Sequence, residues 1–176
     1  LQCVHCNAIG ITGADANLIP ASRRPVKEID YGFAGDVESS KVPMRNWHIL
    51  LNNDWVPVVA PLTHDGKGSL LNTNADTIAQ EVAKALAHDY AVTILYLFEK
   101  TGVLLDVNDE NTVIGHLDPE KYRSLLKEEK IHSGMIPKLE NAFAAMKAGV
   151  KKVIIGNSND LNALITENKG TTLVLH

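Results

Sequence analysis

Two stretches of the 176-residue sequence place polar, reactive side chains where a helix is predicted to begin. The first is residues 72–77 (NTNADT), after which apolar residues recur at helical spacing. Either Asn72 or Asn74 suits the N-cap, where a side-chain oxygen accepts a hydrogen bond from a first-turn N–H. Asp76 then falls in the first turn, where a carboxylate interacts favourably with the helix dipole. Taken alone, this stretch is a capped helix start.

The second stretch is residues 133–138 (SGMIPK), which also precede a helical pattern. Pro137 suits the first helical position. Lys138 lies in the first turn, where a cation is disfavoured by roughly 0.3–1 kcal/mol. A lysine beside unpaired helix-start N–H groups forms an anion site, and Gly134 allows close backbone approach. The alternative is a lysine that turns into solvent.

Together the two helix starts indicate phosphoryl transfer. Helix N-termini at the carboxyl ends of parallel strands face one crevice, where ligands bind in open α/β sheets. An Asp76 carboxylate that pairs with the Lys138 ammonium would hold the lysine ready for a transferring phosphoryl group. The sequence contains no G-x-x-x-x-G-K-[ST], H-R-D or D-F-G motif, which excludes the P-loop and protein-kinase mechanisms.

The cysteines and histidines do not form a recognisable metal or redox motif. Cys3 and Cys6 form a C-x-x-C that precedes a predicted strand, whereas a redox pair should open a helix. We expect both to be reduced, buried apolar residues. The seven histidines show no i, i+4 pair, so no metal site is predicted.

The elements that must position these residues indicate an α/β fold. The second half alternates strands and helices, which favours βαβ units and a mostly parallel sheet. Its predicted elements are a strand at 92–98 buried on both faces, a polar helix at 119–129, a helix at 137–148, a strand at 152–155, a helix at 159–167 and a strand at 171–175. The first half is predicted to hold a strand at 8–11, hairpins and loops at 13–36, a helix at 42–51, a buried strand at 56–60 and a turn at 64–68.

Composition is that of an ordinary folded domain, with 45% hydrophobic and 22% charged residues. The net charge of −4 and the lack of a basic stripe argue against nucleic acid and anionic membranes as partners. No apolar run reaches the roughly 18 residues of a membrane helix, and no signal peptide opens the chain, so a cytoplasmic location is expected. Residues 1–5 have the pattern of a helix tail, which predicts further sequence upstream.

Three motifs resemble the acetylglutamate kinases of the amino acid kinase family: residues 70–76 (LLNTNAD), 134–139 (GMIPKL) and 170–172 (GTT). The resemblance extends over essentially the whole chain. It implies a three-layer αβα sandwich with a mainly parallel central sheet. Residues 1–88 would be the C-terminal part of the N-lobe, which binds acylglutamate and forms the dimer. Residues 89–176 would be the ATP-binding C-lobe.

The implied activity is ATP-dependent phosphorylation of the side-chain carboxylate of N-acetyl-L-glutamate, an acyl phosphate-forming step of arginine biosynthesis. ATP would be a co-substrate with Mg²⁺, with no tightly bound cofactor, and the enzyme would be a homodimer. Carried over by motif, Lys138 and Asp76 are catalytic, and Asn72 and Asn74 bind the acylglutamate. The implied ATP-binding residues are Glu99, Lys100, Thr101, Gly102, Lys130, Gly134, Met135 and Lys138.

Some features depart from the family pattern. Family members carry Asp preceded by Ser or Thr where this chain has Phe98-Glu99. The family's catalytic N-terminal lysine, glycine-rich loops and substrate-binding arginine are expected before Leu1. Arg23 and Arg24 do not match that arginine's motif and are interpreted as surface residues, with nucleotide or subunit contact as the alternative. Two other functions stay open: a catalytically incomplete nucleotide-binding or regulatory module, and a kinase for another acylglutamate such as N-succinylglutamate.

Overall fold

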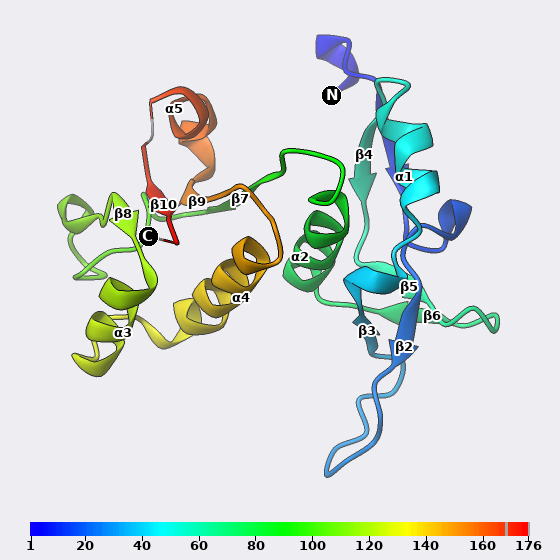
Figure 1. The fold of residues 1–176 in the computed structure, drawn as a ribbon, viewed down its shortest axis with the longest axis horizontal. Coiled ribbons are helices and arrows are strands. Elements are labelled where there is room, and N and C mark those ends of the chain that lie inside the picture. Colours follow the sequence, from blue (N-terminus) through cyan, green and yellow to red (C-terminus); the bar gives the residue numbers. More distant parts are fainter. Residues whose placement is uncertain (168, 176) are drawn as a thin grey trace. The chain divides into compact units, whose positions relative to one another are not determined.

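The computed structural model describes residues 1–167 and 169–175, and the chain divides into two compact units, Leu1–Leu86 and Ala87–His176 (Figure 1). Each unit has its own strands and its own buried residues. Within the described residues, no helix is long and apolar enough to cross a membrane.

The first unit is built around a parallel strand pair and two helices. Strand β1 (Ala8–Ile11) pairs with β4 (Val56–Val59), and the helices are α1 (Met44–Leu51) and α2 (Ala75–Leu86). The buried core they share consists of Ile11, Leu18, Ile19, Val37, Val42, Trp47, Ile78, Val82 and Ala85. Trp47 donates its indole N–H to the Leu18 carbonyl at 3.2 Å, which satisfies its polar atom inside this core.

Two hairpins complete the first unit. Strand β2 (Ala21–Arg23) runs antiparallel to β3 (Gly35–Val37), which confirms the predicted hairpin in residues 13–36. Strands β5 (Leu62–His64) and β6 (Leu70–Asn72) form the second hairpin, of which the sequence predicted only the turn. Single bridges from Pro20 to His64 and from Ala34 to Asn72 connect the two hairpins. Short 3₁₀ helices lie at η1 (Gln2–Val4), η2 (Asp15–Asn17) and η3 (Ser39–Lys41).

Two predictions for the first unit are wrong. Strand β4 is half-exposed rather than buried, with Val56 45% and Val58 48% exposed. Alternate residues of a strand point to opposite faces, and the face of β4 that carries these two valines is left largely open in this unit. Cys3 is exposed and Cys6 half-buried, both as free thiols, because Cys3 lies within the 3₁₀ turn η1, which has no buried residue, and Cys6 follows that turn.

The second unit contains a four-stranded sheet in the order β7-β9-β10-β8. Its strands are β7 (Thr93–Phe98), β9 (Lys152–Asn157), β10 (Thr171–Leu173) and the unpredicted two-residue β8 (His116–Leu117). The β7–β9 and β10–β8 pairs are parallel, as predicted, but β10 runs antiparallel to β9. The short helix α5 (Leu161–Thr166) lies between these two strands in sequence.

Helices cover both faces of this sheet (Figure 1). Helix α4 (Ile136–Lys147) lies on one side, with Leu139, Phe143 and Met146 buried. Helix α5 lies on the other and inserts Leu164 against Gly156 of β9. Helix α3 (Pro119–Lys127) packs beside α4, where the Tyr122 and Phe143 ring centroids are 5.6 Å apart. The unit is therefore a three-layer αβα arrangement, and all three helices begin within two residues of their predicted starts.

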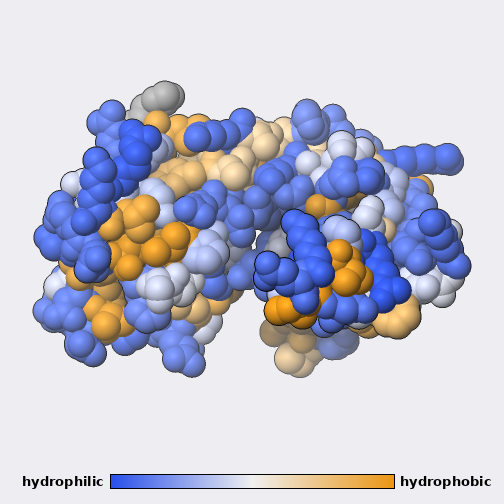
Figure 2. All heavy atoms as spheres, turned by 90° about the horizontal axis from the view of Figure 1, so that it is seen from below, coloured by the Kyte–Doolittle hydropathy of each residue, from blue (hydrophilic) through white to orange (hydrophobic). Residues whose placement is uncertain are grey.

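The prediction that residues 92–98 are buried on both faces is wrong for β7. Ile94 and Tyr96 are buried, whereas Leu97 is 43% exposed. Strand β7 is the edge of the sheet, and the short helix α5 covers mainly β9. Figure 2 shows that hydrophobic residues also reach the molecular surface among hydrophilic ones, and exposed apolar side chains include Leu105 and Val107 of the loop after β7.

Candidate functional site

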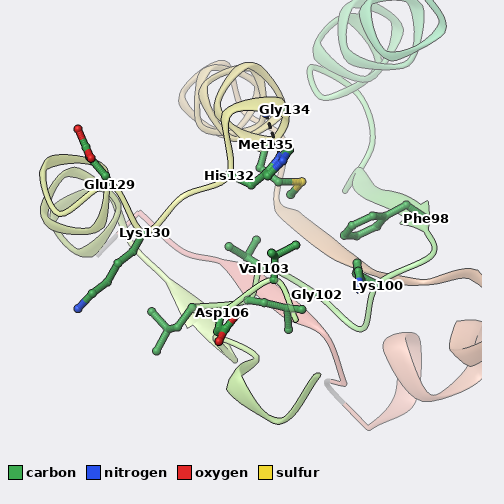
Figure 3. Close-up of a pocket in the computed structure, with 13 residues that line it drawn as sticks. Phe98, Lys100, Gly102, Val103, Asp106, Glu129, Lys130, His132, Gly134 and Met135 are labelled. Atoms are coloured by element: carbon green, nitrogen blue, oxygen red, sulfur yellow. Dashed lines mark hydrogen bonds between the residues drawn. The ribbon is translucent and has the colours of Figure 1, made fainter. Parts of the chain in front are cut away.

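A cavity of about 660 Å³ lies in the second unit where strand β7 ends and helix α4 begins (Figure 3). Ligands of α/β folds bind at this position, beyond the carboxyl ends of strands. Its lining residues are Phe98, Lys100, Gly102, Val103, Leu104, Leu105, Asp106, Val107, Glu129, Lys130, His132, Gly134 and Met135. They come from three segments: the end of β7 with its following loop, the residues after α3, and the turn before α4.

The loop after β7 is fixed from behind by the sheet. The Asn157 side-chain amide donates to the Glu99 carbonyl at 2.6 Å, and the Val103 N–H donates to the Thr171 hydroxyl at 2.8 Å. Gly102 is buried between them, and a Cβ there would lie 2.7 Å from both Thr171 Oγ1 and Val113 Cγ2. Only glycine therefore allows the loop to lie this close to β10, and this contact forms one wall of the cavity.

A carboxylate from the next loop holds the same segment from another side. Glu110 opens the 3₁₀ helix η4 (Glu110–Thr112). It accepts hydrogen bonds from the Thr101 N–H at 3.1 Å and the Thr101 hydroxyl at 2.7 Å, and its second oxygen lies 3.2 Å from Lys100 Nζ. These bonds to Thr101 and the neighbouring Lys100 charge lower the pKa of Glu110 below its usual range, because they favour the ionised form.

The opposite wall is the turn that leads into α4. The 3₁₀ helix η5 (Ser133–Met135) is capped by His132, whose Nδ1 accepts a hydrogen bond from the Gly134 N–H at 3.2 Å, drawn as a dashed line in Figure 3. In this geometry Nδ1 is the unprotonated nitrogen. Met135 stands at the N-cap of α4 and makes no side-chain capping bond, since a thioether cannot replace an Asn or Ser oxygen there.

The lysines differ in their surroundings. Lys130 pairs with Glu128 at 2.7 Å, and Figure 3 shows its side chain extending outward, as does that of Glu129. The ion pair with Lys130 lowers the pKa of Glu128. Lys138 lies three residues beyond Met135, half-buried, with Nζ 6.0 Å from the centre of the Tyr96 ring. Lys100 and Lys130 are thus already neutralised by carboxylates, and the remaining cavity wall is mainly apolar.

In the first unit, the structure decides which asparagine caps α2. Asn74 Oδ1 accepts a hydrogen bond from the Thr77 N–H at 3.1 Å, so Asn74 is the N-cap. Asn72 is the last residue of β6, and its backbone N–H donates to the Phe33 carbonyl at 2.8 Å. Both side chains are exposed, and Asp76 is half-buried in the first turn of α2.

The residue between the two asparagines anchors this segment. Thr73 is buried, and its hydroxyl lies 2.8 Å from that of Thr63 on β5 and 3.3 Å from the Gly35 carbonyl of β3. Buried polar groups that satisfy one another fix a single arrangement. The pair therefore joins both hairpins to the start of α2 and sets where Asn72 and Asn74 emerge.

The cavity gathers most of the residues that the resemblance assigns to ATP. Lys100, Gly102, Lys130, Gly134 and Met135 line it. Glu99 and Thr101 do not line it and instead anchor the loop, and Lys138 lies beyond its wall, in the first turn of α4. The resemblance did not assign the apolar lining residues Phe98, Leu105 and Val107 or the acidic residues Asp106 and Glu129. One signal was present: a loop rich in apolar residues (103–107, VLLDV) usually lines a cavity.

No cluster of three His, Cys, Asp or Glu side chains suited to a metal ion occurs in the described part of the chain. Two carboxylates, Asp106 and Glu129, belong to the cavity wall. Magnesium binds through few carboxylates and keeps several waters, so this donor set fits an ion that arrives with a polyphosphate better than one held by the protein.

Comparisons with known proteins agree with this architecture. The chain is 53% identical over 173 residues to an acetylglutamate kinase of Phocaeicola vulgatus. This match covers 98% of this chain but 65% of that protein. Among solved structures it resembles smu.665 from Streptococcus mutans, with a TM-score of 0.76, 26% identity, and coverage of 100% of this chain and 64% of the other. Giardia carbamate kinase shares the fold, with a TM-score of 0.64 at 14% identity, over 97% of this chain and 63% of the other.

A match to a family model identifies the family. The model described as "Amino acid kinase family" matches residues 1–157. This range contains both helix starts and the whole cavity wall. The chain therefore belongs to the amino acid kinase family.

Proposed function

We propose that the protein to which this chain belongs is an ATP-dependent kinase that phosphorylates the side-chain carboxylate of N-acetyl-L-glutamate in arginine biosynthesis. The observation that carries this proposal is the cavity at the carboxyl end of β7, whose wall includes Gly134 and Met135 of the GMIPKL motif. The 53% identity to an acetylglutamate kinase supports the choice of substrate. The chain spans about two thirds of that relative's length, so the activity is proposed for the full-length protein.

The cavity suits the base and ribose of ATP. Its volume of about 660 Å³ lies within the range of ordinary ligand sites. Phe98, Val103 and Met135 offer apolar surface to a flat ring, and backbone and His132 groups at its edge can hydrogen-bond to it. Because Lys100 and Lys130 are already paired with carboxylates, we assign them to the rim rather than to the phosphates.

The phosphates would extend toward the start of α4. The positive end of the α4 dipole favours an anion there, and Gly134 admits it closely, while the Met135 and Ile136 N–H groups donate to carbonyls of the preceding turn. Lys138 would neutralise the charge that develops as a carboxylate oxygen bonds to the γ-phosphorus and the bond to ADP breaks. Mg²⁺ bound to ATP would neutralise further phosphate charge.

The acylglutamate would be bound by the first unit. Asn72 and Asn74 present exposed amides beside the first turn of α2, and we assign them to the substrate's carboxylate or amide end. Asp76 would orient Lys138 and the upstream lysine that the family carries. Residues 1–88 are then the acylglutamate and dimerisation side and residues 89–176 the ATP side of a cytoplasmic homodimer.

The test is a hydroxamate-trapping assay on the full-length protein with ATP, Mg²⁺ and N-acetylglutamate. An acyl phosphate reacts with hydroxylamine, so coloured hydroxamate should accumulate and depend on both substrates. Parallel reactions with N-succinylglutamate measure the acyl preference, and a higher rate there would replace the proposed substrate. Nucleotide binding in calorimetry without hydroxamate from either substrate would favour the regulatory module instead.

A further inference from the structure

We infer that Glu110 is a positioning residue for the nucleotide cavity, acting on the lining loop through its hydrogen bonds to Thr101. Glu110 is not itself a lining residue. The inference rests on the proposed function only in taking ATP as the ligand of that cavity.

The two oxygens of Glu110 have different partners. Oε2 accepts from both the N–H and the hydroxyl of Thr101, at 3.1 and 2.7 Å, and Oε1 faces Lys100 Nζ at 3.2 Å. Lys100 and Gly102, on either side of Thr101, both line the cavity. The Glu110 carboxylate therefore fixes the backbone at Thr101, between two lining residues, and also the side chain of Lys100.

Glu110 is itself held by a network that reaches a second part of the wall. Asp109 caps η4 by accepting from the Asn111 N–H at 2.9 Å. The Thr112 hydroxyl accepts a hydrogen bond from the Asp106 N–H at 3.0 Å, and it lies within donating distance of the Asp109 carbonyl at 2.7 Å and the Asp106 carbonyl at 3.1 Å. Asp106 lines the cavity, so η4 holds the lining loop at Thr101 and again at Asp106.

The ion pair contributes less than the bonds to Thr101. Lys100 and Glu110 are 41% and 46% exposed, and exposed pairs of this kind add little to stability. A backbone N–H and a hydroxyl that share one charged acceptor fix the loop far more specifically. The role of Glu110 is therefore to keep the loop in its binding conformation, so that ATP does not have to order it.

This division of roles predicts a particular order among three substitutions in the full-length protein. Glu110→Ala removes every contact and should raise the KM for ATP about tenfold, with kcat unchanged within about twofold. Glu110→Gln keeps an oxygen for Thr101 and should stay close to wild type. Glu110→Asp keeps the charge but is too short to reach Thr101, so it should resemble Glu110→Ala.

Glu38→Ala is the matched control, because Glu38 also forms an exposed ion pair, with Lys41 at 2.6 Å, but lies outside the cavity wall. It should leave the KM for ATP unchanged. Three outcomes would overturn the inference: wild-type KM in all variants, a loss confined to kcat, or a normal Glu110→Asp with a defective Glu110→Gln.

A readout without turnover separates this inference from the proposed function. In the nucleotide-free protein, hydrogen exchange at the Thr101 and Val103 amides should be faster in Glu110→Ala than in wild type. Unchanged exchange contradicts the positioning role even if the enzyme is a kinase. Faster exchange in a protein that does not bind ATP or AMP-PNP would support the positioning role and reject the nucleotide as ligand.

Discussion

The helices α2 and α4 both follow a kinase-like motif, yet their first turns are built in opposite ways. Helix α2 begins with Asn74, whose side chain caps the Thr77 N–H, and it carries the acidic Asp76 in its first turn. Helix α4 follows the N-cap residue Met135, which makes no side-chain capping bond, and its first turn carries the basic Lys138. The first helix start is stabilised by a side-chain cap and an acid, whereas the second relies on backbone bonds to the preceding turn and adds a cation that an external anion would neutralise.

This contrast separates stability from function. A cap and a first-turn acid lower the free energy of the folded state, so α2 is stabilised by its own sequence. A first-turn lysine on an uncapped helix is locally unfavourable, and local conflicts of this kind are typical of binding sites. We therefore expect substitutions at α4 to change activity more than stability, and substitutions at the cap of α2 to do the reverse.

The largest effect is expected for Lys138→Ala in the full-length protein. Loss of a preorganised cation at the transferring phosphoryl group should lower kcat by about 10²–10³-fold, with a much smaller change in substrate binding. Hydroxamate trapping gives kcat and KM. Lys147→Ala, in the last turn of the same helix, is the control. An unchanged kcat for Lys138→Ala would remove the transition-state role.

Asp76→Asn tests whether the Asp76 carboxylate stabilises the start of α2 or takes part in the reaction. Because Asn74 already caps the helix, the variant should keep its fold and its Tm within a few degrees, while activity falls about 10²-fold through misplaced lysines. Circular dichroism on heating and the trapping assay measure the two quantities. If the variant is simply unfolded at assay temperature, Asp76 acts through stability and the contrast between the helices fails.

Gly102→Ala and Gly134→Ala compare the two walls of the cavity. A Cβ on Gly102 meets two side chains at 2.7 Å, so this variant should lose about 1–3 kcal/mol of stability. At Gly134 the nearest atom, His132 Nδ1, would lie 3.3 Å away, so stability should change by less than about 0.5 kcal/mol. Urea unfolding measures both. Calorimetry should nevertheless show weaker ATP binding for Gly134→Ala, and wild-type affinity would contradict an anion site at α4.

The smallest effect is expected at the cap. Asn74→Ala leaves the Thr77 N–H without its partner and should destabilise the protein by about 1 kcal/mol, whereas Asn74→Asp should retain most of the stability. Urea unfolding of the two variants side by side provides the measurement. If Asn74→Ala and Asn74→Asp lose stability equally, capping is not the role of this side chain. A rise in the KM for N-acetylglutamate in both would support substrate contact.

Patterns along the chain predicted most elements but not the relations between them. The strand at 8–11 and the helices at 42–51, 119–129 and 137–148 follow from local periodicity, which needs only neighbouring residues. The antiparallel direction of β10 and the exposure of β4 and β7 depend on how elements pack. Two-residue β8 is too short to have a pattern of its own.

The candidate site shows the same limit. Gly134 and Met135 were assigned because they lie in a contiguous motif, and Lys100 and Gly102 because the resemblance to the family also covers their segment. Glu110 was not, because it stands in a polar run (106–111, DVNDEN) that is indistinguishable from a solvated loop. Its bonds to Thr101 span nine residues and depend on a 3₁₀ turn that no local pattern indicates.

The packing of Gly170 has a consequence for mutational tolerance. This residue has φ +82°, and a Cβ there would lie 2.6 Å from the Ile155 carbonyl, 2.7 Å from Leu164 Cδ2 and 3.4 Å from the Thr101 carbonyl. Any replacement must therefore displace the sheet, helix α5 or the loop after β7 that contains Thr101, although residue 170 does not line the cavity. A substitution at Gly170 should thus impair function although this residue does not contact the ligand.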